Sequence, residues 1–244
     1  MPSPTTVPPS QETKRPQGNR WRQAASLPQL AKKDDSNRTR DIYDSILWRI
    51  DAKRQANDTL AVGMTGCQRK SGASTIAANL AVRASDQQRG RILLMDASWQ
   101  LPGMLKTFEV SQELGVYDIL SGEVSPRECE PHAITDNLDL LCRGKWNEDQ
   151  PARVQQDLVA EMLSDLKTEY SLILVDLPEA NELRSALPLA RELDGTLLVT
   201  RFEAVTKTQV QNAYLRLQED GVRVWGSILN RYHDYVPSWL RNWV

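Results

Sequence analysis

The stretch TGCQRKSGASTIAANLA, residues Thr65–Ala81, follows a short apolar run and leads into an alanine-rich segment. A phosphate-binding loop has the pattern G-x-x-x-x-G-K-[ST], in which glycines allow the turn, the lysine contacts phosphates and the hydroxyl binds Mg²⁺. In this chain Gly72 is followed by Ala73 and then by Ser74 and Thr75. The stretch therefore predicts a strand, a phosphate-type turn and a helix, without the lysine that the pattern requires.

Short apolar runs alternate with helical segments on both sides of this stretch. Six runs are predicted to be strands: Leu60–Thr65, Arg91–Asp96, Leu138–Cys142, Ser171–Asp176, Gly195–Arg201 and Arg223–Asn230. They are nearly continuous in Ile, Leu and Val, which is typical of parallel strands that are buried on both faces. The sequence thus predicts a doubly wound α/β domain with a mainly parallel sheet flanked by helices.

Apolar residues at helical spacing mark the helices of this domain. Helices are predicted from Asp41 and over Ser74–Ser85, Pro151–Glu169, Glu182–Leu193 and Ala204–Glu219. In the helix from Asp41, Ile42, Ile46 and Ile50 share a face, with Tyr43 and Leu47 beside them. In Pro151–Glu169 the apolar face consists of Val154, Leu158, Met162 and Leu166. In Ala204–Glu219 it consists of Val210, Tyr214 and Leu217.

Composition and charge divide the chain into three parts. Residues 1–40 hold eight Lys/Arg, three Asp/Glu and six of the thirteen prolines, a net charge of +5 in a chain of net charge −2. Such a segment cannot bury enough apolar surface to offset ordering, so we predict a disordered basic arm. The folded domain is expected over residues 41–235, followed by a Trp-rich tail over residues 236–244.

The tail carries Trp239, Leu240 and Trp243 on one side of a short predicted helix. Tryptophan at this density can lie in a membrane interface or in the groove of a partner. The segment can equally fold back onto its own domain, and the sequence leaves both alternatives open.

The bulk properties exclude several classes of protein. The overall charge gives no whole-chain case for binding nucleic acid, and two histidines make a histidine-rich metal site unexpected. No run approaches the ~18 apolar residues of a membrane span. Three cysteines without metal-ligand spacing suit a reducing compartment, so a cytoplasmic protein is expected.

Aspartates close two of the predicted strands. The second strand ends in ILLMD at Asp96, and the fourth ends in LILVD at Asp176. Ligands of open parallel sheets bind at the carboxyl ends of the strands. An aspartate at such an end can hold a Mg²⁺-bound water or orient the hydroxyl of a phosphate loop. We therefore expect the turn Gly72–Thr75 to face Asp96 and Asp176.

Six segments occur in this order along about residues 41–235: SGASTIAANLAVRAS, RILLMDASWQLPGMLKTFEV, LGVYDILSGE, NLDLLCRG, YSLILVDLPEA and GSILNR. They follow in order the landmarks of the bacterial tyrosine kinases, which this chain resembles. These P-loop autokinases of capsule and exopolysaccharide assembly are related to the septum-site and partition ATPases. GVYDILSGE and the proline of WQLPGMLKTF are more specific than the loop. The resemblance implies the P-loop NTPase fold.

The resemblance also implies a set of site residues with ATP or ADP and Mg²⁺ as ligands. Gly72 and Ser74 match the turn and its Mg²⁺ ligand, followed by Thr75. Asp96 matches the first aspartate of the second acidic motif, Asp176 the Walker B aspartate and Asn230 the residue that contacts the base. The site therefore comprises Asp96 and Asp176 as catalytic remnants, Gly72, Ser74, Thr75, Lys70 and Asn230 for the nucleotide, and Ser74, Asp96 and Asp176 for the metal.

The departures from the family pattern fall at functional positions. Ala73 replaces the lysine of the Walker A loop, and Lys70 occupies a position where glycine is usual. Ser98 replaces the second aspartate of the D-x-D motif, and Glu179 replaces a proline. Asp44 and Leu47 replace both arginines of the assembly motif, and Tyr232 and Tyr235 stand where active members carry a tyrosine cluster. Because phosphoryl transfer depends on positioned charge, we expect weak nucleotide binding and impaired catalysis.

The expected function is a regulatory or scaffolding subunit of exopolysaccharide or capsule assembly. Its expected partner is the cytoplasmic segment of a membrane chain-length or export protein, at the inner face of the cell membrane, and a homo-oligomer remains an alternative. Two other functions stay open. One is an active autokinase or ATPase in which Lys70 or Arg69 takes the place of the missing lysine, and the other is a partition-type or septum-site-type positioning ATPase.

Overall fold

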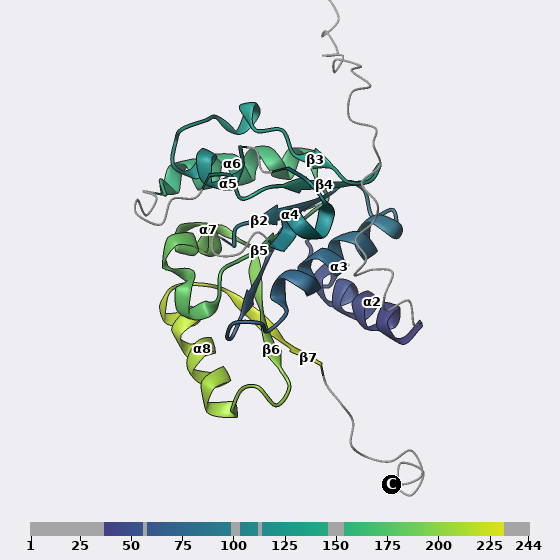
Figure 1. Ribbon diagram of the computed structural model, residues 1–244, viewed down its shortest axis with the longest axis vertical. Helices are drawn as coiled ribbons and strands as arrows, with labels where there is room; N and C mark the ends of the chain where they lie inside the picture. The colour runs from purple at the N-terminus through teal and green to yellow at the C-terminus, as the bar shows by residue number, and fades with distance from the viewer. Residues whose placement is uncertain (1–36, 56–57, 99–102, 112–113, 146–153, 232–244) are drawn as a thin grey trace, which may run out of the picture.

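A seven-stranded sheet forms the centre of the molecule (Figure 1). The computed structural model describes residues 37–55, 58–98, 103–111, 114–145 and 154–231, so most of the expected arm and all of the expected tail lie outside it. The strands are β1 (Leu60–Gly66), β2 (Ile92–Asp96), β3 (His132–Ala133), β4 (Leu138–Leu141), β5 (Leu172–Asp176), β6 (Gly195–Arg201) and β7 (Val224–Asn230). Their order is β3-β4-β2-β5-β1-β6-β7.

The predicted parallel sheet is confirmed, with one addition at its edge. All six predicted strands are present and pair in parallel. The extra strand β3 has two residues and pairs antiparallel with β4. The prediction of six strands was therefore wrong by one, because two residues are too short to show any hydrophobic period.

Helices cover both faces of the sheet (Figure 1), with α2 and α3 on one face and α5 to α8 on the other. Their bounds are α2 (Asn37–Asp51), α3 (Ala73–Asp86), α4 (Gly103–Phe108), α5 (Val116–Leu120), α6 (Gln156–Glu169), α7 (Leu187–Glu192) and α8 (Lys207–Glu219). Two 3₁₀ segments are present, η1 (Pro126–Glu128) and η2 (Ala180–Ala186).

Several predicted helices start or divide differently from expectation. Helix α2 begins at Asn37, so residues 37–40 belong to this helix and their assignment to a disordered arm was wrong. Helix α6 begins at Gln156, so Val154 lies before it, and Pro151 lies outside the described residues. The expected helix Glu182–Leu193 consists of η2 followed by α7, with Pro188 in the first turn of α7. Helix α8 begins at Lys207 because the Thr206 side chain accepts a bond from the backbone of Gln209 and caps it.

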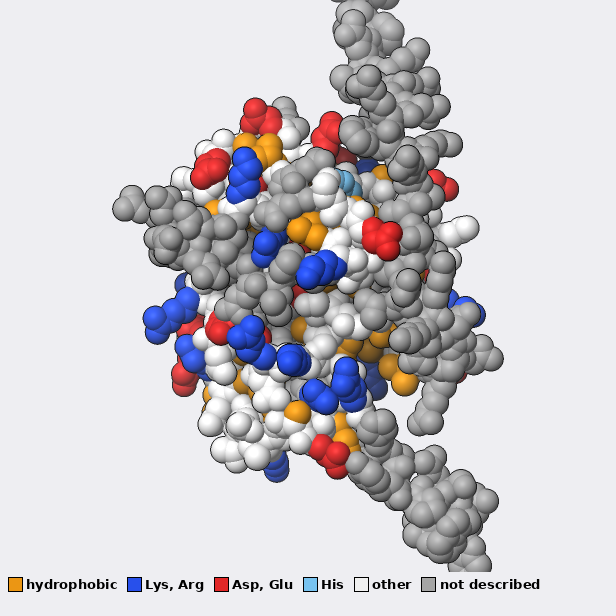
Figure 2. All heavy atoms as spheres, viewed as in Figure 1, with side chains coloured by type: hydrophobic (Ala, Val, Ile, Leu, Met, Phe, Trp, Pro, Cys, Tyr) orange, Lys and Arg blue, Asp and Glu red, His pale blue; other side chains and the backbone are white. Residues whose placement is uncertain are grey.

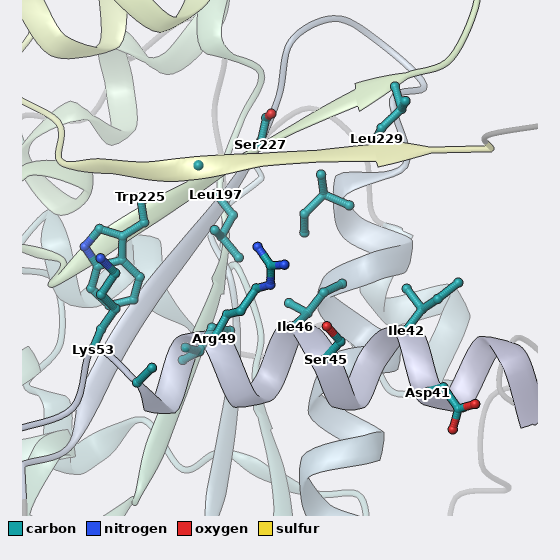
Figure 3. Close-up of a pocket in the computed structure, with 14 residues that line it drawn as sticks. Asp41, Ile42, Ser45, Ile46, Arg49, Lys53, Leu197, Trp225, Ser227 and Leu229 are labelled. Carbon is teal, nitrogen blue, oxygen red and sulfur yellow. The ribbon is translucent and has the colours of Figure 1, made fainter. Parts of the chain in front are cut away.

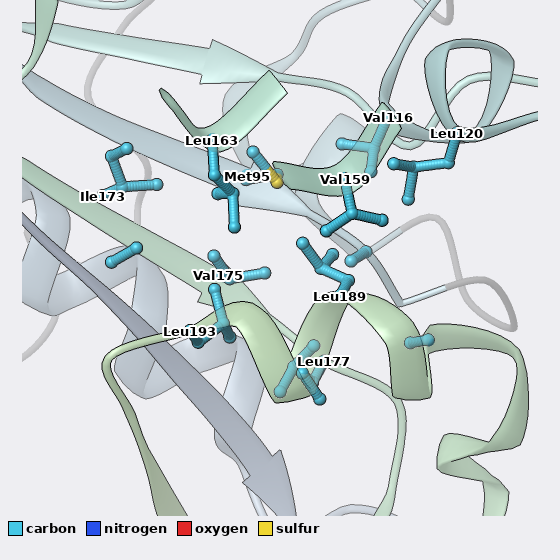
Figure 4. Packing of buried hydrophobic residues seen from close by; sticks show 14 of the residues in the cluster. Met95, Val116, Leu120, Val159, Leu163, Ile173, Val175, Leu177, Leu189 and Leu193 are labelled. Carbon is cyan, nitrogen blue, oxygen red and sulfur yellow. The ribbon is translucent and has the colours of Figure 1, made fainter. Parts of the chain in front are cut away.

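The apolar side chains of the strands alternate between two cores. Ile173 and Val175 of β5 face the core under α5, α6 and α7, whereas Leu172 and Leu174 face the core under α2 and α3. Figure 4 shows the first core, in which Val159 and Leu163 point from α6 towards the sheet. The period of two in strands thus produces one buried layer on each face.

Helix α2 packs on α3 through part of its expected apolar face. Leu47 and Ile50 are buried, whereas Ile42 is 53% exposed, so the inclusion of Ile42 in the core face was wrong. The reason is that α2 packs against α3 on the side of Asp44, whose carboxylate accepts two bonds from Arg83 at 2.6 and 2.7 Å. The arginine guanidinium lowers the pKa of Asp44 through this hydrogen bond.

The last helix shows a similar deviation. Ala213 and Leu217 are its buried residues, and Tyr214 is 37% exposed, so Tyr214 was wrongly placed on the core face. Its apolar stripe is narrower than the sequence pattern suggests because α8 covers the margin of the sheet, over β6 and β7.

Replacement of Leu47 tests the contact between α2 and α3. We expect Leu47→Ala to lower the free energy of unfolding by about 2–4 kcal/mol, because it removes a fully buried side chain and leaves a cavity. The matched control is Trp48→Ala, the adjacent residue, whose side chain is 69% exposed. That variant is expected to change stability by about 0.5 kcal/mol or less. Urea denaturation measures both, and equal losses would contradict the packing.

Candidate functional site

The site lies where three neighbouring strands end. Strand β5 pairs with β1 on one side and with β2 on the other, so their carboxyl ends meet at one edge of the sheet. Asp96 and Asp176 are partners in register, the last residues of β2 and β5. The loop after β1 leads into α3 beside them, and the Ser74 side chain makes a hydrogen bond with Asp176. The structure thus brings the turn and both aspartates together as expected.

The loop between Gly66 and Gly72 turns tightly. Gly72 precedes α3 with φ of 94°, a left-handed conformation that favours glycine. Lys70 also adopts a left-handed φ of 61°, at the position where the family pattern has glycine. A non-glycine residue pays about 1 kcal/mol or more for this conformation. The chain therefore keeps the shape of the turn in spite of the replaced side chain.

Asn230 holds this loop from the neighbouring end of β7. Its Nδ2 donates to the Ser71 carbonyl oxygen at 2.8 Å, and its Oδ1 accepts from the Arg231 backbone N–H at 2.8 Å. A Cβ added to Gly72 would lie 2.2 Å from Nδ2, so the amide packs directly against the turn. The structure gives Asn230 a positioning contact, and its predicted contact with a base stays a prediction.

Both aspartates are buried, and burial dominates their titration. Burial raises the pKa of Asp96 to about 7, partly offset by the Ser98 backbone N–H, at 3.0 Å from Oδ1, and by the charge of Arg143. Burial also raises the pKa of Asp176 well above its usual value, and the neighbouring Asp96 charge adds to this, while Ser74 opposes it. Two carboxyls at adjacent strand ends cannot both ionise cheaply without a nearby cation.

The residues present fit a Mg²⁺–nucleotide pair better than a bare metal ion. Asp96 Oδ2 and Asp176 Oδ1 are buried without a hydrogen-bond partner, as expected of atoms that face a hydrated cation. No cluster of three or more His, Cys, Asp or Glu side chains suitable for a metal occurs in the described ranges. Mg²⁺ commonly takes one or two carboxylates and completes its shell with phosphate oxygens and water. Ser74, Asp96 and Asp176 would therefore hold the ion together with a phosphate.

The cations of the loop lie at the surface. Arg69 is 64% exposed, with Nε 3.8 Å from the carboxylate of Glu179, and Lys70 is exposed. Burial raises the pKa of Glu179, the nearby Glu182 adds to this, and Arg69 opposes it. Thr75 is also exposed, whereas Ala73 is buried as the first residue of α3. Where the loop pattern has its lysine, this chain places a buried methyl group.

Sequence reasoning missed Arg143, whose charge acts on Asp96. Arg143 follows the strand β4, which neighbours β2, so the rule that identified the two aspartates could have found it. Backbone bonds tie its segment to the start of α5, from Val116 N–H to Cys142 O at 2.9 Å and from Tyr117 N–H to Arg143 O at 2.8 Å. The GVYDIL and CRG segments therefore form one structural unit beside the site.

A buried carboxylate locks this unit. Asp118 Oδ2 accepts from the Gly115 backbone N–H at 2.8 Å and from the Lys145 backbone N–H at 3.2 Å. A Cβ at Gly115 would lie 2.0 Å from the Cys142 carbonyl oxygen, so only glycine permits this approach. The unit explains physically why these two segments occur together in the sequence.

Positive charge gathers near the strand ends that hold the loop. Figure 2 shows Lys and Arg side chains over the region where the β1–α3 loop and the ends of β6 and β7 lie in Figure 1. The exposed Arg69 and Lys70 belong to the loop, and Arg231 follows Asn230 directly. Such a surface favours the approach of an anion even without a lysine inside the turn.

The pKa shift of Asp96 predicts how stability depends on pH. Because the folded-state pKa is raised from 3.8 to about 7, the folded state binds the proton more tightly, and the free energy of unfolding should fall as pH rises from 4 to 7. Between pH 5 and 8 the expected loss is about 2–3 kcal/mol, at ~1.4 kcal/mol per unit. Asp96→Asn should reduce this slope, and the part that remains is expected from Asp176, whose pKa burial also raises.

Urea denaturation at pH 5 and pH 8 in the presence of a chelator measures the slope. The control is Asp165→Asn on the exposed surface of α6, which should keep it. An Asp96→Asn protein with the slope of the parent would show that burial does not govern this carboxyl.

Comparison with known proteins shows that this chain is similar in sequence to tyrosine-protein kinases of bacteria. No protein-family model matches the chain. It is 27% identical over 191 residues to the tyrosine-protein kinase Wzc of Salmonella typhi, covering 75% of this chain and 26% of Wzc. It is 28% identical over 169 residues to the tyrosine-protein kinase Etk of Escherichia coli K12, covering 68% of this chain and 23% of Etk. The chain thus spans about a quarter of the length of these relatives.

Solved structures give the same answer for the fold. The kinase domain of Escherichia coli ETK superposes with a TM-score of 0.73 at 22% identity, over 92% of this chain and 88% of that domain. The VpsO kinase domain gives 0.65 at 27% identity, over 80% and 95%. MinD of Pyrococcus horikoshii, solved with Mg-ADP, gives 0.60 at 22% identity over 75% of each chain. The chain is therefore similar in sequence and fold to the kinase domains of bacterial tyrosine kinases, and it has the P-loop NTPase-like fold of these structures and of MinD.

Proposed function

We propose that this chain is a bacterial tyrosine kinase-like domain of a capsule or exopolysaccharide system that holds nucleotide phosphate weakly and does not transfer it. In this proposal it acts as a regulatory or scaffolding subunit on the cytoplasmic side of a membrane complex. Relatives named as tyrosine kinases, one of them encoded in a cps region of Klebsiella pneumoniae, support the system.

One observation carries the proposed loss of transfer. The turn, Ser74 and both strand-end aspartates are assembled, but the first residue of α3 is a buried alanine. Backbone N–H groups at a helix start still attract an anion. A charge-assisted bond from lysine contributes roughly 1.5–3 kcal/mol, so its loss weakens phosphate binding by about 10- to 150-fold. Loss of one preorganised donor slows transfer by about 10² to 10³.

Ser98 adds a second loss near the metal. At this position the family pattern has an aspartate, whereas here the backbone N–H of Ser98 donates to Asp96 Oδ1. The Ser98 hydroxyl brings no negative charge to the cation. Burial raises the pKa values of both remaining carboxyls, so a proton competes for them more strongly than for an exposed aspartate. Metal binding to this site therefore competes with protons and should strengthen as pH rises.

A displaced cation is the alternative route to activity. Arg69 or Lys70 would have to reach the phosphates from an exposed position on the loop. Arg69 lies near Glu179, which competes for its charge. Lys70 stands in a left-handed conformation outside the helix start. These positions give less support to phosphoryl transfer than to a loop that only binds.

The nucleotide prediction separates these functions. We expect poor affinity of the parent protein for Mg-ATP and no labelling of Tyr232 or Tyr235, both outside the described residues. Ala73→Lys should raise the affinity about 10- to 150-fold, because it restores the charge-assisted bond. Transfer should require Ser98→Asp in addition. Isothermal titration and labelling with radioactive ATP measure the two effects.

The matched control is Lys70→Ala, which removes a loop cation and leaves Ala73 in place. If the parent labels its own tyrosines and Lys70→Ala abolishes the labelling, the chain is an active kinase with a displaced lysine. Nucleotide-dependent dimerisation with binding to membrane or DNA would instead identify a partition-type ATPase.

The proposed partner is the cytoplasmic segment of a membrane chain-length or export protein. Among the described residues, no helix has the length and apolar character needed to cross a bilayer. Two positions of the family's assembly motif serve contacts inside this chain, Asp44 to Arg83 and Leu47 in the core. We infer that attachment to such a complex uses other surfaces of the domain.

Affinity purification tests the partner. The tagged full chain, cross-linked in its own cells and recovered from detergent-solubilised membranes, should enrich a polysaccharide-assembly protein over a tag-only control. Leu47→Ala serves as the control for loss of fold. Recovery of no polysaccharide-assembly component from membranes would overturn this proposal and leave the nucleotide prediction intact.

A further inference from the structure

A groove of about 770 Å³ runs between helix α2 and the edge strand β7 (Figure 3). From the sheet, Trp225 and Leu197 point towards the helix, and from the helix Ile46 and Arg49 point towards the sheet. Ile42, Ile50 and Ile228 add to the apolar lining, and Asp41 and Lys53 add charge. The groove is thus mostly apolar, with charged residues at its rim.

This groove leaves apolar surface uncovered among the described residues. Ile42 on the helix wall is 53% exposed, and Trp225 and Ile228 on the strand wall are only partly buried. A Cβ added to Gly226 would meet no atom within 4 Å, so the groove is open beside β7. Strand β7 ends the sheet, and edge strands of natural proteins are commonly covered. A segment that fills the groove would cover the apolar surface of α2 and the exposed side of β7.

We propose that residues 236–244 of this chain dock in the groove, with Trp239, Leu240 and Trp243 as anchors. These residues begin six positions after the end of β7 and carry three large apolar side chains in five positions. Tryptophan supplies a large apolar surface with a polar N–H that suits a groove with a polar rim. The volume lies in the range of sites that bury a ligand of similar bulk, about 300–1,000 Å³.

The length of the connection permits this docking. Strand β7 ends at Asn230, and Leu229 lies at that end of the groove. Trp239 is eight positions after Arg231, the last described residue, and eight residues span up to about 26–29 Å when extended. Seven residues of β7 span about 23 Å. The connection is therefore long enough for the tail to reverse its direction and bring Trp239 into the groove.

Tethering favours this occupant over a free one. A segment joined by a short linker has an effective concentration in the millimolar range, so modest affinity suffices to fill the groove. A second copy of the chain would need a far higher affinity at ordinary concentrations. Docking of the tail therefore requires no partner.

Cross-linking tests the docking in the full chain. Ser45→Cys on the groove wall and Ser238→Cys beside Trp239 provide the pair, and a short bismaleimide joins them. The native cysteines Cys67, Cys129 and Cys142 are buried and should react slowly. The control pair combines Ser238→Cys with Ser164→Cys, an exposed residue of α6 on the opposite face of the sheet. We expect an intramolecular product at least about tenfold faster with Ser45→Cys, since docking raises the local concentration.

Two variants show whether the anchors and the groove cause this rate. Trp239→Ser with Trp243→Ser should lower it at least about fivefold, whereas Trp21→Ser in the arm should leave it unchanged. Gly226→Phe fills the groove from within and should lower it as well. Equal rates for the two pairs, rates insensitive to both variants, or a dimeric product in place of the intramolecular one would overturn the proposal. A loss caused by Trp21→Ser would assign the groove to the arm and also overturn it.

Discussion

The parallel pairing of β2, β5 and β1 is the constraint on which the site depends. Because β5 lies between the other two strands, the carboxyl ends of all three meet, and Asp96 lies opposite Asp176 in register. Both strands are buried on each face, so their terminal carboxylates enter a medium of low polarity. The raised pKa values follow from this burial. A cation at this edge would be the natural counterpart of the pair.

The phosphate-type turn is held from outside as well as by its own residues. Asn230 at the end of β7 fixes the Ser71 carbonyl, and Gly72 allows the amide to approach. On the far side, the unit formed by GVYDIL and CRG places the charge of Arg143 near Asp96. The frame of the candidate site is therefore built from three separate parts of the chain. Ala73 replaces the lysine of the family pattern within the turn, and the frame does not depend on that side chain.

The first helix illustrates how a change of sequence changes the use of a surface. Where the resemblance places two arginines, this chain has Asp44, which pairs with Arg83, and Leu47, which is fully buried. Both contacts lie within one chain and fix α2 on α3. The opposite side of α2 keeps exposed apolar residues and borders the groove along β7.

The sequence alone determined the fold class, the six parallel strands and the placement of both aspartates beside the loop, because continuous apolar runs and strand-end aspartates are local patterns. It could not show the two-residue strand β3, which is too short to have a period. It also misjudged Ile42 and Tyr214, since helical periodicity gives the apolar stripe but not the part that a neighbour covers. The contacts of Asn230 with Ser71 and of Asp44 with Arg83 join residues 159 and 39 positions apart, and only the tertiary structure could decide them. The pKa values of Asp96 and Asp176 are likewise tertiary properties, because burial is set by all the elements that surround the sheet.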